Sequence, residues 1–288
     1  MRRIVSFSML SLAAGALSAC TADQVTETTT PPTAGVRFIN AVPDTAGSAG
    51  LDFRFVDIVE NSSHFKIPFR NNVVTTGGVP GSTLIEYKNT QAGARHLRIF
   101  LSDTLQAVAQ TVLKDTTLNL EAGKKYTAIM WGNARPGTAP AARLSIIEDA
   151  PADPTTNIAL RVINTTGSPV DVRQYLSTAT LPGSATWAAV PALGVSTYVT
   201  SAPGQIRFNV QPAGGGTALF ADPLALLGTA ATVDLDAIPG TTIAGSAVTA
   251  IIWPRSVAGS RAPQAAAFTT PAISFAWDRR PPRTCALC

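Results

Sequence analysis

The chain has 288 residues, of which 45% are hydrophobic and 14% are charged, and it contains 22 glycines and 21 prolines. A disordered chain is poorer in apolar residues and richer in charge, so this composition indicates a folded, turn-rich β protein. The formal net charge is +4. Because the basic residues are scattered, with no basic run interleaved with aromatic residues, nucleic acid is excluded as an expected partner.

The first segment in chain order, residues 1–19, has the three parts of a secretory signal. Arg2 and Arg3 precede an apolar run at 4–16, and Leu17-Ser18-Ala19-Cys20 follows it. The apolar run of about 13 residues is shorter than the roughly 20 needed to cross a bilayer. An ordinary signal peptide needs no cysteine at its cleavage point. The segment resembles bacterial lipoprotein signals, which implies cleavage before Cys20, a lipid on that cysteine and attachment to a membrane.

Residues 20–34 predict a flexible tether, because they are rich in Thr and Pro and lack apolar periodicity. Fully stretched, 14 residues reach at most roughly 45–50 Å. In proteobacterial lipoproteins an aspartate after the lipidated cysteine favours the inner membrane, so Thr21 favours the outer membrane. We therefore expect a lipid-anchored protein of the bacterial cell envelope, and the side of the membrane that it faces stays open.

An internal duplication organises the chain after the tether. Tyr87 and Gly93 recur as Tyr198 and Gly204 at one offset of 111. The other segments that recur, in order, are 36–40 and 160–164, 51–54 and 170–173, 97–99 and 206–208, 118–120 and 233–235, 126–131 and 248–253, and 145–149 and 274–278. This order predicts two homologous domains at 35–150 and 157–280, followed by a tail at 281–288.

Each copy predicts short strands separated by Gly, Pro, Asn and Asp turns at roughly 8 to 15 residue spacing, which is typical of an all-β sandwich. Residues 126–131 favour a central strand, because alternation puts mostly apolar side chains on both of its faces. Residues 97–100 and 206–208 alternate apolar with charged residues and favour a sheet with one wet face. The expected fold is two tandem immunoglobulin-like β-sandwich domains.

The order of these motifs resembles the DUF4397 family, envelope-associated bacterial domains of unknown function that are often lipoproteins and often in tandem. The resemblance is carried by the segments 36–44, 51–54 and 126–129. The second copy keeps Arg161, Asn164 and Asp171 but lacks the Pro-Asp that follows the first strand of copy one. The resemblance spans nearly all of residues 35–280. It implies an extracytoplasmic β-sandwich and brings no catalytic residues with it.

Residues that carry chemistry are scarce. His64 and His96 are the two histidines, and neither recurs in the second copy. No Cys/His cluster or Asp-rich loop has the spacing of a zinc or calcium site, and no nucleophile elbow or phosphate-binding loop occurs. We therefore expect no metal, no cofactor and no catalytic residue.

Three charged positions recur early in each domain, and they are Arg37 with Arg161, Asp52 with Asp171, and Arg54 with Arg173. One interpretation makes them a shared binding site. The other, which is favoured, makes them cross-strand ion pairs that fix register, since such pairs are common in sheets and contribute roughly 0.2–1 kcal/mol.

Cys285 and Cys288 form a Cys-x-x-Cys pair at the end of the chain. This spacing occurs in thiol oxidoreductases and in half of a zinc site. Here the helix start, the thioredoxin-like context and a second cysteine pair are lacking, so a disulfide in an oxidising envelope is the favoured interpretation. The leading function is a non-enzymatic envelope lipoprotein that binds an envelope protein or glycan, or acts as a spacer. The alternative is an envelope enzyme or a thiol-redox protein that uses this pair.

Overall fold

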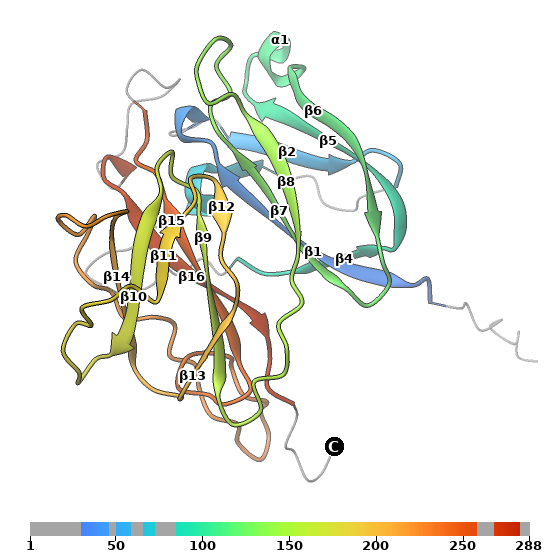
Figure 1. Cartoon of the computed structure of the whole chain (residues 1–288). Helices are drawn as coiled ribbons and strands as arrows, with labels where there is room; N and C mark the ends of the chain where they lie inside the picture. Colours follow the sequence, from blue (N-terminus) through green and yellow to red (C-terminus); the bar gives the residue numbers. More distant parts are fainter. Residues whose placement is uncertain (1–29, 46–49, 59–65, 73–84, 258–267, 283–288) are drawn as a thin grey trace, which may run out of the picture. The chain divides into compact units, whose positions relative to one another are not determined.

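The computed structural model of the chain describes residues 30–45, 50–58, 66–72, 85–257 and 268–282. Their regular structure is almost entirely β, which confirms the predicted all-β sandwich class (Figure 1). Up to residue 150 the elements are β1 (Thr33–Ala41), the 3-10 turn η1 (Pro43–Thr45), β2 (Gly50–Phe55), β3 (Lys66–Pro68), the 3-10 turn η2 (Phe69–Asn72), β4 (Lys88–Gln91), β5 (Gly93–Ser102), α1 (Gln106–Ala109), β6 (Val112–Leu120), β7 (Lys125–Trp131) and β8 (Arg143–Glu148). Beyond residue 150 they are β9 (Ile158–Asn164), β10 (Val170–Leu176), β11 (Trp187–Val190), β12 (Gly194–Val195), β13 (Val199–Ser201), β14 (Ile206–Pro212), β15 (Ala247–Trp253) and β16 (Ala272–Arg279).

The first sandwich packs a sheet of order β4-β1-β7-β8 against a sheet of order β3-β2-β5-β6. β1 runs parallel to β7 and antiparallel to β4. Side chains from the inner faces of both sheets form one apolar core that includes Phe53, Leu97, Ile99 and Ala128. Leu97 and Ile99 are buried while Arg98 between them is partly exposed, so β5 has the single wet face that its alternation predicts.

The predicted central strand is confirmed in β7, which lies between β1 and β8. Tyr126, Ala128 and Met130 belong to the core of the first sandwich. Ile129 and Trp131 point the opposite way, into a separate apolar cluster. Both faces of the strand are therefore covered, as the two apolar sets of side chains require.

The second sandwich repeats this arrangement with a sheet of order β12-β9-β15-β16, in which β13 also pairs with β9, and a sheet of order β11-β10-β14. β9 runs parallel to β15, as β1 does to β7. Its core includes Leu160, Val172, Phe208 and Val248, and the ring of Trp187 stacks on Phe208 with centroids 6.1 Å apart.

One predicted equivalence fails in the structure. Residues 118–120 lie in β6, but their matches at 233–235 form no strand, and Val233 and Leu235 are exposed. The outer edge of β14 is instead occupied by residues 219–225, where the amides of Leu219 and Ala225 donate to the carbonyls of Val210 and Ile206. The backbone groups at this edge of β14 therefore form hydrogen bonds with an irregular segment, which takes the place that β6 has in the first sandwich.

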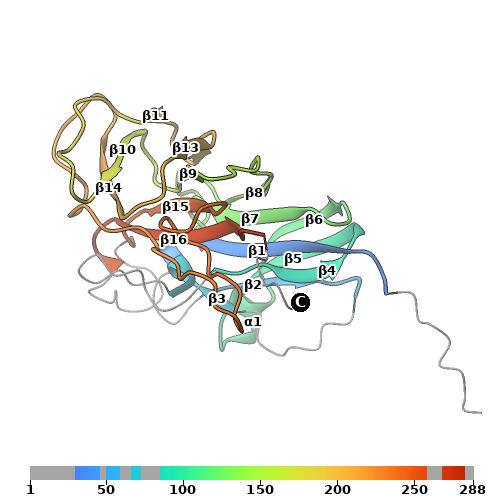
Figure 2. The same cartoon turned by 90° about the horizontal axis from the view of Figure 1, so that it is seen from below.

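The sheets that contain β1 and β9 turn their outer faces toward each other, and the red strands β15 and β16 lie next to β1 and β7 in both views (Figures 1 and 2). The apolar side chains that meet there include Ile39, Ile129, Trp131, Ile163, Ile251 and Trp253. Each tryptophan donates its indole N–H to a serine of the neighbouring strand, Trp131 to Ser145 at 3.0 Å and Trp253 to Ser274 at 2.7 Å. The described residues from Pro32 onward belong to one compact unit.

Candidate functional site

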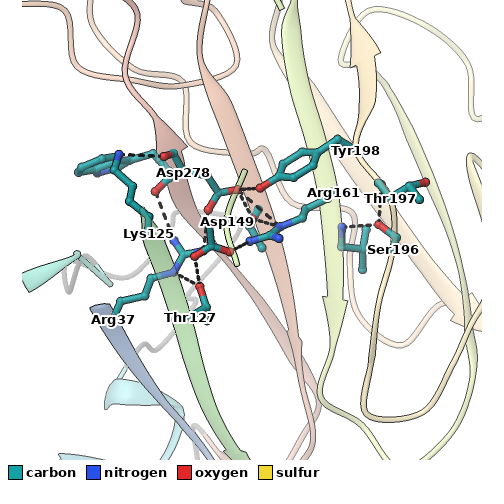
Figure 3. Close-up of polar contacts among 12 residues, drawn as sticks. Arg37, Lys125, Thr127, Asp149, Arg161, Ser196, Thr197, Tyr198 and Asp278 are labelled. Atoms are coloured by element: carbon teal, nitrogen blue, oxygen red, sulfur yellow. Dashed lines mark hydrogen bonds and ion pairs between the residues drawn. The ribbon is translucent and has the colours of Figure 1, made fainter. Parts of the chain in front are cut away.

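Two arginines and two aspartates lie buried between the sandwiches, at the end where β1 begins (Figure 3). Arg37 comes from β1 and Asp149 directly follows β8, while Arg161 comes from β9 and Asp278 from β16. The side chains of Arg37, Asp149 and Asp278 have no exposed surface and that of Arg161 is 3% exposed. Charged groups are almost never this deeply buried unless they are paired.

The pairing is crosswise. Nη2 of Arg37 in the first sandwich donates to Oδ1 of Asp278 in the second at 2.6 Å, and Arg161 in the second donates to Asp149 in the first. Each arginine also lies 3.6 Å from the other carboxylate of the group. The two positive and two negative charges therefore neutralise one another, and each arginine makes its shorter contact with the carboxylate of the other sandwich.

The residues of the first sandwich hold this geometry through their own hydrogen bonds. The register of β1 against β7 sets Arg37 beside Thr127, and Nε of Arg37 donates to Oγ1 of Thr127 at 2.7 Å. The Thr127 hydroxyl donates in turn to Asp149, and the Tyr87 hydroxyl donates to Oδ2 of Asp149 at 2.7 Å. The guanidinium of Arg37 lies over the Tyr87 ring at 4.6 Å, within cation–π range.

The second sandwich repeats every one of these contacts. Arg161 is in register with Thr249 and donates to its hydroxyl at 2.8 Å. Thr249 and Tyr198 both donate to Asp278, the latter at 2.7 Å. The guanidinium of Arg161 lies 4.7 Å from the centre of the Tyr198 ring. These eight residues, Arg37, Tyr87, Thr127, Asp149, Arg161, Tyr198, Thr249 and Asp278, are called the ion network below.

The pKa shifts favour the charged forms of Arg37, Arg161 and Asp278. Burial alone would lower the pKa of Arg37 and of Arg161, but the nearby carboxylates outweigh it and raise both. Burial would raise the pKa of Asp278, yet Arg37 and Arg161 hold it below its ordinary value. Burial also raises the pKa of Tyr87 and of Tyr198. These shifts keep Arg37, Arg161 and Asp278 charged and Tyr87 and Tyr198 protonated, which fits a structural lock.

An open pocket of about 280 Å³ adjoins the ion network. Its lining includes Asp149, Asp278, the turn at Gly123 and three basic residues, Lys124, Lys125 and Arg279. The Lys125 ammonium donates to the backbone oxygen of Asp278 at 3.1 Å (Figure 3). Burial lowers the pKa of Lys125.

The favoured interpretation of the repeated charges is wrong for the arginines. Arg37 pairs with Asp278, 241 positions away, and has no ion pair with Asp52. Arg161 pairs with Asp149 and not with Asp171, whose carboxylate accepts from the amides of Ala189 and Gly214. These arginines face away from the core of their own sandwich, because the alternation of β1 and β9 puts them on the face that meets the other sandwich.

The third repeated pair also differs from the prediction. Arg54 lies 3.7 Å from Asp52 on the same strand β2, so this contact crosses no strand boundary and fixes no register. Arg173 has no such aspartate and donates to Oε1 of Gln211 at 3.0 Å. Both arginines lie on the sheets that face away from the other sandwich.

The remaining residues singled out in the sequence lie elsewhere. His96 is on the wet face of β5, where it contacts Asp115. His64, Leu17, Ser18, Ala19, Cys20, Cys285 and Cys288 lie outside the described residues. Within the described residues, no group of three or more His, Cys, Asp and Glu side chains is placed to hold a metal ion. No helix among them is long and apolar enough to cross a membrane.

Sequence reasoning missed the partners of the arginines, although a signal for them was present. Tyr87, Thr127 and Asp149 all recur in the second copy, and Thr127 lies inside a mostly apolar strand. A polar residue that is repeated within a buried strand needs a buried partner. That rule, applied to Thr127 and Asp149, would have connected them with Arg37.

Residues 34–173 match the family model described as Domain of unknown function (DUF4397). The match contains the first sandwich and continues through β9 into β10. It therefore includes Arg37, Tyr87, Thr127, Asp149 and Arg161, and ends before the second tyrosine, threonine and aspartate of the ion network. None of the curated proteins compared with the chain is significantly similar to it.

Proposed function

We propose that this protein is a non-enzymatic, lipid-anchored module of the bacterial cell envelope, in which two DUF4397 sandwiches form one rigid body that binds an envelope protein or glycan or acts as a spacer. The observation that carries the proposal is the crosswise ion network, because each buried arginine donates its hydrogen bond to a carboxylate of the other sandwich. A pair of domains locked in this way keeps a fixed distance and orientation between its two ends.

The tandem arrangement is supported by the strand pairings of the two sandwiches. The parallel pair β1 and β7 corresponds to β9 and β15, and the antiparallel pair β7 and β8 corresponds to β15 and β16. β2 with β5 corresponds to β10 with β14. The equivalent contacts of the ion network fall at the same places in these strands. A duplicated DUF4397 domain accounts for all of these correspondences at once.

Rigidity is supported by the chemistry of the shared interface. Separation would expose the buried side chains of Ile39, Ile129, Trp131 and Ile251 to water. Burial of an apolar side chain of this size contributes about 1.5–3 kcal/mol. The buried charges fix the orientation of one sandwich relative to the other. Two apolar faces can shift past each other at little cost, whereas the four charges are paired in one relative position only.

The membrane anchor is supported by the Leu17-Ser18-Ala19-Cys20 motif and by the Thr- and Pro-rich residues that precede β1. Metabolic labelling of cells with a palmitate analogue, followed by membrane fractionation, tests it directly. The wild-type chain should be labelled and sediment with membranes, and Cys20→Ala should be unlabelled and keep its signal. Cys285→Ala is the matched control and should be labelled as wild type. Label on the Cys20→Ala chain would refute the anchor.

A binding role is tested by thermal unfolding of the unlipidated chain, residues 21–288, with glycans and peptidoglycan fragments. A ligand that binds only the folded state raises stability by RT ln(1 + [L]/Kd), so a saturable increase in Tm identifies the ligand class. A chain that shows no shift with any of them would be assigned to the spacer role, with cross-linking in intact envelopes as the search for a protein partner.

A further inference from the structure

The two sandwiches repeat the ion network but differ in the residues beside it. Lys125, Trp277 and Arg280 lie at the edge of the interface, and alignment of the two copies puts Ala247, Glu148 and Pro151 at the equivalent positions. The contacts that lock the sandwiches are therefore symmetric, whereas a cationic and aromatic cluster occurs on one side alone. Lys125 and Trp277 also make contacts between the sandwiches, since Lys125 donates to the backbone oxygen of Asp278 and the Trp277 ring packs edge-on against Tyr87. The other side is held by the ion network without such contacts, so locking alone does not require them.

The cluster is built around the indole of Trp277. The Lys125 ammonium lies 5.3 Å from the centre of the Trp277 ring and 5.1 Å from that of Tyr87. The Arg280 guanidinium lies 4.6 Å from the Trp277 ring. Trp277 is partly exposed and Arg280 is exposed. A tryptophan between two cations at a surface is the combination that occurs at the boundary between membrane and water.

Two of the four basic residues around this cluster have no carboxylate partner among the described residues. Lys124 is paired with Glu121 and Glu148, and Arg279 is paired with Asp153. In the part of the chain that the structure describes, neither Lys125 nor Arg280 has a carboxylate within ion-pair distance. These two side chains are therefore available to an anion from outside.

The cluster lies where the tether joins the first sandwich. The amide of Gly123, in the turn that lines the pocket, donates to the carbonyl of Thr33 at 2.8 Å, and Thr33 is the first residue of β1. The lipidated Cys20 would be 13 residues upstream of Thr33, a span of at most roughly 45 Å. An N-terminal lipid would therefore hold this part of the sandwiches within that distance of the bilayer.

We propose that Lys125, Trp277 and Arg280 form a docking surface for the headgroups of anionic phospholipids in the membrane that holds the anchor. The proposal rests on the lipid anchor proposed above, because the anchor brings this surface to the membrane. The two cations contact lipid phosphates while the indole enters the headgroup layer. Docking fixes the orientation of the two sandwiches, whereas the tether alone leaves it free.

Vesicle sedimentation of the unlipidated chain, residues 21–288, tests the surface separately from the anchor. Vesicles that mix phosphatidylglycerol with phosphatidylcholine should bind it, and pure phosphatidylcholine should bind it weakly. Each basic residue near an anionic surface contributes roughly a fivefold change in affinity, so Lys125→Ala with Arg280→Ala should weaken binding about thirtyfold. Arg280→Ala alone changes only an exposed side chain and should weaken binding about fivefold, which covers the case in which the double variant misfolds.

The matched control is Arg54→Ala with Lys114→Ala, which removes the same charge from the first sandwich's outer sheet of β3-β2-β5-β6 and should leave binding unchanged. Fluorescence supplies a second measurement, because Trp131, Trp187 and Trp253 are buried and Trp277 is the partly exposed indole. Nitroxide-labelled lipids should quench the wild-type chain, and Trp277→Phe should abolish the quenching.

Equal binding to neutral and anionic vesicles, or equal loss in the control variant, would overturn the proposal. Quenching that persists in Trp277→Phe would also overturn it. If inorganic phosphate alone raises Tm through Lys125 and vesicles do not bind, the site is a small-anion site and not a membrane surface. Because the tested chain carries no lipid, none of these results depends on the lipidation of Cys20, which palmitate labelling decides independently.

Discussion

The ion network predicts a specific pattern of non-additive stability changes in a double-mutant cycle of Arg37 and Asp278. Asp278→Asn removes one of the two carboxylates and leaves Arg37 and Arg161 to share Asp149, which buries one net positive charge. Asp278 accepts hydrogen bonds at 2.6 Å from Arg37 and at 2.7 Å from Tyr198, and it has no exposed side-chain surface. Loss of one member of a buried ion pair costs about 3–5 kcal/mol.

Arg37→Met removes the opposite charge and leaves two buried carboxylates for one arginine, so its cost should be similar. The double variant restores neutrality, because Arg161 and Asp149 remain paired. Its free energy of unfolding should therefore fall by no more than that of either single variant, which corresponds to a coupling free energy of at least about 3 kcal/mol. Urea unfolding of the three variants and of wild type measures the cycle.

The matched control is Asp115→Asn, whose carboxylate is 44% exposed and pairs with His96 and Arg98 on the wet face of β5. Exposed pairs are screened by water and salt, so this change should leave the unfolding midpoint nearly unaltered. The reasoning would be refuted if the loss of unfolding free energy in the double variant equalled the sum of the two single losses to within about 0.5 kcal/mol. Losses at independent sites are additive, whereas losses at two members of one neutral group are not.

Three further predictions follow from the same interface. The pKa of Asp278 is held below its ordinary value of 3.8, so the unfolded chain takes up a proton before the folded chain as pH falls. The free energy of unfolding should therefore decrease as the pH drops below about 3.8. Asp278→Asn should reduce this pH dependence, which urea titrations at several pH values measure. Ile251→Ala removes a fully buried side chain from the cluster between the sandwiches and should cost about 2–5 kcal/mol by urea unfolding, whereas Ile146→Ala, 37% exposed on the edge strand β8, should change stability by about 0.5 kcal/mol or less. Tyr198→Phe removes a hydrogen bond to a buried carboxylate and should cost about 1.5–3 kcal/mol; an unchanged midpoint would show that the hydroxyl adds nothing to the network.

The strand architecture could be predicted from the sequence because it depends on local alternation. Two apolar faces at 126–131 correctly predict a covered central strand, and Leu97 and Ile99 around Arg98 correctly predict a half-exposed one. Alternation says which residues share a face, but not what that face meets. The partner of Arg37 is 241 positions away in another sandwich, and no local pattern encodes such a contact.

The same limit explains why the sequence predicts Asp52 and Asp171 as the partners of these arginines. Asp52 and Asp171 are close in sequence to Arg37 and Arg161, and cross-strand pairs are common in isolated sheets. That expectation assumes that the arginines face water, but the face that carries them is covered by the other sandwich. Burial removes the solvent that makes a surface pair weak and selects the carboxylates that can neutralise the group completely.

The proposed duplication gives a physical reason for the placement of these charges. A single sandwich already has its own arginine and aspartate close together, since Arg37 lies 3.6 Å from Asp149, but its Thr127, Ile129 and Trp131 would face water beside them. A second copy with the same face covers these apolar side chains. It also brings a carboxylate to the arginine of the first copy and an arginine to its aspartate. Identical faces can meet this way only if each arginine reaches across to the other copy's carboxylate. Lys125 and Trp277 break the repeat, and their contacts with Asp278 and Tyr87 have no counterpart on the other side. Because the ion network holds that other side without them, these residues are open to selection for contacts with something outside the chain.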